Sequence, residues 1–94
     1  MAKASDEPYR LLVARPAKNA LTESLPEKTA LAVMEFISGP LLDSPRKVGK
    51  RLRAPLAPAF SARRGSYRVT YLIDEGTRAV TVTAVTRRGH AYRT

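Results

Sequence analysis

The stretch at residues 60–74, FSARRGSYRVTYLID, decides the fold, because two short runs of strand-forming residues flank a Gly-Ser pair. A two-residue hairpin loop at Gly65 and Ser66 places Arg63 directly opposite Arg68. Side chains in that position share one face of the sheet at about 5 Å. Two arginines there repel each other, so the pair indicates either an anionic partner or two solvated surface cations.

Upstream of the hairpin, the sequence predicts one strand and two helices. Residues 9–14, YRLLVA, are expected to form a strand that stops before Pro16, and residues 16–23 a short helix. The second helix is expected to begin at a capping box formed by Ser24 and Glu27, and to end before a Gly-Pro pair. Its spacing predicts a face packed on a sheet, made of Ala30, Val33, Met34 and Ile37 and widened by Leu31 and Phe36.

Three more strands are predicted at residues 60–64, 67–73 and 79–86. In the last strand, Val80, Val82 and Ala84 are expected to face inward, and Thr81, Thr83 and Val85 outward. The order β-α-α-β-β-β predicts an α+β fold, in which two N-terminal helices pack on one face of a small, mostly antiparallel sheet. The first strand must then pair with a later one. We expect a single domain over residues 1–94, with residues 1–8 disordered.

Composition excludes several kinds of function. A chain of 94 residues buries one modest core. It contains no cysteine, which rules out disulfides and thiolate metal sites, and its single histidine argues against a protein-only transition-metal site. No apolar run approaches the roughly 20 residues that span a bilayer, and the first residues lack the apolar segment of a secretory signal. We therefore expect a cytoplasmic protein with no membrane association, no metal and no small-molecule cofactor.

The net charge of +9 is unevenly spread. Residues 1–44 carry five basic and six acidic residues, whereas residues 45–94 carry twelve basic and two acidic ones. A concentrated basic field of this kind favours a polyanion, most often nucleic acid, over an anionic membrane or an acidic protein. Part of it lies in the loop PRKVGKRLRAP, whose cations are Arg46, Lys47, Lys50, Arg51 and Arg53.

The available side chains suit metal-free phosphate chemistry. Asp74 and Glu75 lie in one turn and match a two-metal site poorly. RNA can be cleaved without a metal when its own 2′-OH attacks the neighbouring phosphorus and arginines stabilise the developing charge. Arginine is a poor general base, so His90 is the best-tuned candidate for proton transfer, followed by a lysine such as Lys50 or by Tyr92. Tyr92 can also stack on unpaired bases. The plainer alternatives are a solvated tail histidine and a tyrosine packed on the domain.

Together, the element order, the loop PRKVGKRLR, the hairpin SARRGSYRVTYLID and the ending VTRRGHAYR resemble the RelE/ParE toxin family of toxin–antitoxin modules. The resemblance covers nearly the whole chain. Its most specific part is R-x-G-x-Y-R-x-x-Y, at Arg63, Gly65, Tyr67, Arg68 and Tyr71. Within the family the chain is similar to the RelE branch, which cleaves messenger RNA in the ribosomal decoding site.

That resemblance implies roles for particular residues. Four would form the catalytic site: Arg63, Arg68, Arg88 and Tyr92. Others would bind RNA: Lys47, Lys50, Arg51, Arg53 and Arg87. The tail of relatives commonly reads H-R-x-x-x-Y, and here Arg87 replaces the histidine. In an unbroken strand, Arg87 rather than Arg88 shares the face of Thr81 and Thr83, so a bulge or a strand end near Thr86 is needed to turn Arg88 towards RNA.

The resemblance also implies partners: a cognate antitoxin in a hetero-oligomer, the ribosome and messenger RNA. Two other functions stay open. One is a ParE-like inhibitor of DNA gyrase without nuclease activity, and the other is a non-catalytic RNA-binding domain. A shared fold does not separate them, because function depends on the site. The basic, tyrosine-ended tail favours the nuclease.

Overall fold

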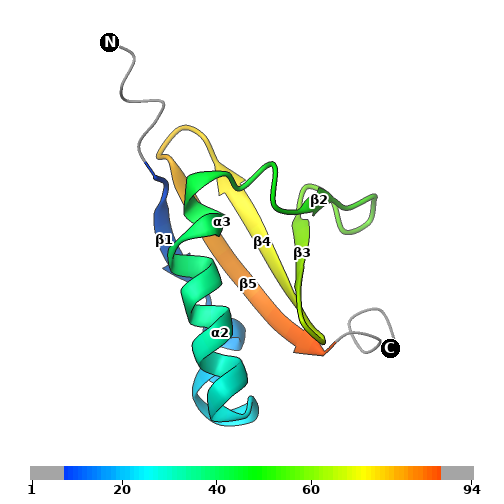
Figure 1. Ribbon diagram of the computed structural model, residues 1–94. Coiled ribbons are helices and arrows are strands. Elements are labelled where there is room, and N and C mark those ends of the chain that lie inside the picture. Colours follow the sequence, from blue (N-terminus) through cyan, green and yellow to red (C-terminus); the bar gives the residue numbers. More distant parts are fainter. Residues whose placement is uncertain (1–7, 88–94) are drawn as a thin grey trace.

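The computed structural model describes residues 8–87 (Figure 1). The expectations for residues 1–7 and for Arg88, His90 and Tyr92 therefore lie outside the described part. The elements are β1 Arg10–Val13, α1 Arg15–Asn19, the π-helical segment η2 Ala20–Ser24, α2 Glu27–Ser38, α3 Pro40–Asp43, β2 Lys50–Arg51, β3 Phe60–Arg64, β4 Tyr67–Asp74 and β5 Ala79–Arg87. The helices lie on one face of a five-stranded mixed sheet, so the predicted α+β class is confirmed.

The sheet has the strand order β1-β5-β4-β3-β2. Strands β2 to β5 pair antiparallel, while β1 pairs in parallel with β5 and occupies an edge. The first strand thus pairs with a later one, as expected. Two elements had not been predicted, α3 and β2. Strand β2 consists of two charged residues and has no apolar alternation to signal it, and α3 spans a single turn.

The predicted start of the second helix was wrong in detail. Helix α2 begins at Glu27 with Pro26 at its N-cap, and no side chain caps it. Ser24 is instead the last residue of η2, where the backbone N–H of Leu25 donates to the carbonyl of Ala20. Because Ser24 closes the preceding helical segment, it does not form the capping box with Glu27.

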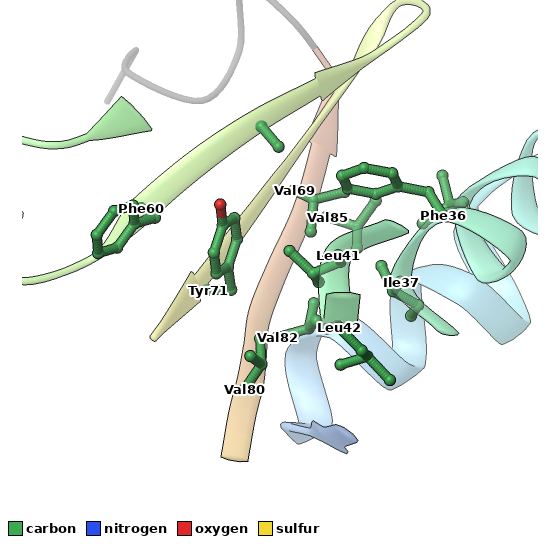
Figure 2. Packing of buried hydrophobic residues seen from close by; sticks show 13 residues of the cluster. Phe36, Ile37, Leu41, Leu42, Phe60, Val69, Tyr71, Val80, Val82 and Val85 are labelled. Atoms are coloured by element: carbon green, nitrogen blue, oxygen red, sulfur yellow. The ribbon is translucent and has the colours of Figure 1, made fainter. Parts of the chain in front are cut away.

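The buried face of α2 is also narrower than its apolar pattern predicts. Val33, Phe36 and Ile37 are buried, but Leu31 and Met34 are 60% and 40% exposed. The helix contacts the core along one stripe, and the other apolar positions point to solvent. The buried core consists of Ala17, Val33, Phe36, Ile37, Leu41, Leu42, Phe60, Ala62, Val69, Tyr71, Val80, Val82 and Val85 (Figure 2).

A β-bulge reverses the alternation of β5. The register with β4 shifts between Thr70 and Tyr71, where Thr83 is an extra residue without an opposite partner. The Thr83 hydroxyl donates to the carbonyl of Thr70 at 3.2 Å. Beyond the bulge, Val85 faces the core and Ala84 the other side, opposite to the prediction for both. The sequence pattern misses this because strict alternation assumes an unbroken ladder.

Tyr71 of β4 is fully buried and lies on the side of the core where Phe60 is (Figure 2). Its ring stacks on that of Phe60, with centroids 5.6 Å apart. Its hydroxyl donates a buried hydrogen bond of 2.6 Å to the carbonyl of Pro45. Burial raises the pKa of Tyr71 to about 12, so the hydroxyl remains a donor throughout the neutral range.

We expect Tyr71→Phe to lower the free energy of unfolding near neutral pH by about 1–3 kcal/mol, because it leaves the Pro45 carbonyl buried without this partner. The folded pKa of about 12 exceeds the ordinary value of 10.0, so the stability that Tyr71 contributes is complete below pH 10 and is lost as the pH rises towards 12. The gap between wild type and variant should therefore narrow by roughly 1–2 kcal/mol at about pH 11. Urea unfolding at both pH values measures it, and a gap independent of pH would contradict the assignment.

Candidate nucleic-acid interface

The β3–β4 hairpin has the predicted register. Gly65 adopts a φ of 62°, in the left-handed region that glycine enters without steric cost. Arg63 lies opposite Arg68, and Arg64 lies opposite Tyr67. The arginine pair inferred from the sequence is thus confirmed as a directly opposed pair across the ladder.

The two arginines share the face of the sheet that the helices leave uncovered. Their neighbours Ala62 and Val69 are buried against the helices, and alternation turns the next residue of each strand to the other side. Arg63 is exposed and Arg68 is half-buried. Arg64 points to the helix side, where its guanidinium carbon lies 4.9 Å from the ring centroid of Phe36.

A groove of about 550 Å³ runs between the basic loop and this face of the hairpin. We define the basic loop as residues 45–53. The groove is lined by Lys47, Val48, Gly49, Lys50, Leu52, Ser61, Ala62, Arg63 and Arg68. Four of these residues are cations and none is a carboxylate. Such a site attracts anions, and a phosphodiester backbone is one of them.

Strand β2 divides the cations of the basic loop between the two sheet faces. Lys50 lies opposite Ser61 and lines the groove, whereas Arg51 lies opposite Phe60, on the helix side. Arg53 follows the strand and is exposed outside the groove. Of the predicted RNA-binding residues in this loop, the structure therefore brings Lys47 and Lys50 to the arginine pair, but not Arg51 or Arg53.

Arg46 has a different partner. Its Nε and Nη2 donate to Oε2 of Glu75, at 3.0 and 2.8 Å, and the hydroxyl of Tyr9 bonds both oxygens of the same carboxylate. These hydrogen bonds, first that from Arg46, hold the pKa of Glu75 below its usual range. The cluster ties the β4–β5 turn to the start of the basic loop and of β1. Sequence reasoning missed it, because Arg46 and Glu75 are 29 positions apart.

The bulge at Thr83 determines which side of β5 faces the groove. Thr86 lies opposite Arg68, while Arg87 lies opposite Tyr67 and so belongs to the helix side. The irregularity that the sequence analysis required is present, three residues before the expected place. Arg87, predicted to bind RNA, does not share the face of the arginine pair. Outside the described residues lie Arg88, His90 and Tyr92.

Two further features concern residues 8–87 only. No three His, Cys, Asp or Glu side chains gather there in the way that a bound metal ion requires. No helix in this part of the chain combines the length and apolarity needed to cross a bilayer.

Gly49 and Ser61, which line the groove, were not singled out from the sequence, because a glycine in a basic run and a serine in a strand carry no pattern of their own.

The fold and the groove define a small α+β protein with a cationic groove on the uncovered face of its sheet. The chain is 46% identical over 88 residues to Toxin RelE of Mycobacterium tuberculosis, covering 94% of this chain and 90% of that protein. It is 42% identical over 86 residues to Toxin RelG of the same organism, covering 92% and 98%. The chain therefore belongs to the RelE family of toxins.

Solved structures of RelE proteins have the same fold as this chain. The crystal structure of the toxin–antitoxin complex RelBE2 from M. tuberculosis matches with a TM-score of 0.83 at 41% identity, covering 87% of this chain and all of that one. A mutant of the E. coli toxin RelE in the free state matches with a TM-score of 0.74 at 20% identity, covering 90% and 88%, which supports the fold alone. No family model matches the chain.

We expect Arg63→Thr to raise the free energy of unfolding by about 0.2–1 kcal/mol, because it removes a like charge directly opposite Arg68. The gain should shrink when salt is added. The matched control is Arg64→Thr on the other face, which should lower stability by roughly 0.5–1 kcal/mol through loss of the Phe36 contact. Urea unfolding at low and high salt measures both variants. Destabilisation by Arg63→Thr would show that the pair does not repel.

Proposed function

We propose that this protein is the toxin of a type II toxin–antitoxin system and an endoribonuclease that cleaves messenger RNA in the ribosomal decoding site. One observation carries the proposal: Arg63 and Arg68 oppose each other in a groove where the lining from residues 8–87 has four cations and no carboxylate. The two like charges repel each other, whereas a phosphate bound between them is attracted to both. Membership of the RelE family supports the same function.

The proposed reaction uses the substrate's own nucleophile. The 2′-oxygen forms a bond to phosphorus, the bond from phosphorus to the 5′-oxygen breaks, and the products are a 2′,3′-cyclic phosphate and a 5′-hydroxyl. One proton leaves the 2′-OH and one reaches the departing oxygen. Arg63 and Arg68 hold the non-bridging oxygens and stabilise the charge that builds up on them. No metal enters this scheme.

The remaining predicted residues have supporting roles. Lys47 and Lys50 contact the RNA backbone within the groove, and Arg51 and Arg53 contact ribosomal RNA outside it. By family resemblance, Arg88 and Tyr92 complete the site, the first on phosphate and the second by stacking on a base. The ribosome supplies orientation by presenting messenger RNA in an extended form.

The same proposal includes a cognate antitoxin. The crystal structure of a RelBE2 complex at 41% identity supports a toxin that pairs with a second protein. An acidic or amphipathic antitoxin segment complements the basic half of this chain, and its binding prevents access of RNA to the groove. Both partners act in the cytoplasm, where ribosomes translate.

Cleavage by this protein in a translating extract tests the proposal. We expect cuts at the codon in the decoding site, and a loss of about 10²–10³ in rate for Arg63→Ala or Arg68→Ala. Arg15→Ala, which removes an exposed arginine of α1 away from the groove, is the matched control and should cleave normally. If messenger RNA stays intact and DNA supercoiling is inhibited, the protein is a gyrase inhibitor and the proposed nuclease function is wrong. If messenger RNA stays intact but the protein still binds RNA, the function is that of a non-catalytic RNA-binding domain.

Proton transfer is tested by Lys50→Arg, which keeps the positive charge but replaces the ammonium by a guanidinium that does not give up its proton. If Lys50 moves a proton, we expect RNA affinity to be kept and cleavage to fall by about 10²–10⁴. The comparison variant is His90→Gln. The alternative outcome is that only His90→Gln loses cleavage, and that the change in cleavage rate near pH 6.5 disappears in this variant. That result would assign the proton transfer to the histidine.

A further inference from the structure

The basic loop is joined to the core by one buried contact. The Tyr71 hydroxyl, on the helix side of β4, donates at 2.6 Å to the carbonyl of Pro45, which is itself buried at the start of the loop. The two residues are 26 positions apart. This bond fixes where the chain leaves α3 and begins to cross towards β2.

A second constraint acts at Gly49. A Cβ atom at this position would lie 2.8 Å from the carbonyl oxygen of Ser61 and would overlap the Tyr71 hydroxyl. Backbone atoms cannot move aside as the end of a flexible side chain can. Only glycine therefore allows the loop to lie this close to β3 and to Tyr71.

The two lysines that line the groove lie close to these two contacts in the chain. Lys47 falls within the segment that Pro45 and Gly49 delimit, and Lys50 follows directly and pairs with Ser61 of β3. The ion pair of Arg46 with Glu75 also restrains the loop, but both side chains are about half exposed, and pairs of that kind contribute little. The buried tyrosine is thus the stronger restraint.

We propose that Tyr71 is a positioning residue, whose hydroxyl, seated between Pro45 and Gly49, places Lys47 and Lys50 above the Arg63–Arg68 pair. This inference rests on the proposed function, since it assumes that the groove binds RNA. It assigns the tyrosine a role in binding although its side chain is fully buried and does not line the groove. The four cations are then held at fixed distances from one another when they bind one RNA backbone. A flexible loop would not maintain these distances.

The test is the salt dependence of RNA binding. The probe is a short single-stranded RNA with 2′-deoxy substitutions that prevent cleavage, and fluorescence anisotropy gives Kd over a series of salt concentrations. Each phosphate contact contributes about 0.7 to the slope of log K against log salt. If Tyr71→Phe and Gly49→Ala release the two lysines, each variant should lose about 1.4 from the slope and bind roughly three- to thirtyfold more weakly.

Two comparisons separate positioning from a loss of stability. Partial unfolding lowers the active fraction but leaves the salt slope of the folded protein unchanged. In addition, Lys50→Ala should weaken binding less in the Tyr71→Phe background than in wild type, whereas Arg63→Ala should weaken it equally in both. The matched control is Tyr67→Phe in the same strand, for which we expect the wild-type slope.

The outcomes distinguish failure of the proposed function from failure of the role of Tyr71. If wild type does not bind the probe, or if Arg63→Ala binds as tightly as wild type, the proposed function fails. If wild type binds and Arg63→Ala weakens binding, but Tyr71→Phe and Gly49→Ala keep the wild-type slope and the full effect of Lys50→Ala, the role of Tyr71 alone is overturned. Should Tyr71→Phe not fold, Gly49→Ala decides, because it displaces the Tyr71 hydroxyl without removing any core side-chain atom.

Discussion

The alternation of β4 is the constraint on which the other features depend. Val69 and Tyr71 point into the core, and Arg68 between them and the hairpin turn points to the uncovered face. A slip of one residue would bury Arg68 and expose Tyr71, at a cost of several kcal/mol for the buried charge alone. The hydrophobic core therefore holds the arginines in register. It does so although the arginines themselves repel, because burial of the neighbouring side chains outweighs a surface repulsion of at most about 1 kcal/mol.

The bulge at Thr83 extends this control to the next strand. It keeps Val82 and Val85 in the core although they are separated by two residues, an interval that an unbroken strand would divide between its two faces. As a result, Thr86 rather than Arg87 stands opposite Arg68. The face on which the last described residues of β5 lie is thus set by packing at the core, through an irregularity that keeps both valines buried.

Much of this could be predicted from sequence, and the failures have physical causes. The hairpin was predictable because a Gly-Ser turn between alternating strands determines register locally, and the arginine pair followed from it. The outward direction of Val85, the capping role of Ser24 and the burial of Met34 were wrong, because each depends on how separate elements pack. Lys47 and Lys50 were predicted as binding residues from the charge of the loop and from the resemblance to the RelE/ParE family. That they meet the arginines, while Arg51 turns away, required the pairing of a two-residue strand.

The carboxylate of Glu75 lies away from the cationic groove. Glu75 lies in the turn after β4, at the end of that strand away from Arg68, and there it bonds Arg46 and Tyr9. A carboxylate in the groove would neutralise part of the field that attracts phosphate, whereas at the far end it leaves this field intact and adds a weak restraint on the loop. Arg46 and Lys47 are adjacent in sequence but contribute differently, one to an ion pair and the other to the groove. Within the basic loop, Arg46 thus contributes to attachment and Lys47 contributes charge to the groove. The buried Tyr71 bonds Pro45, the residue at which this loop begins.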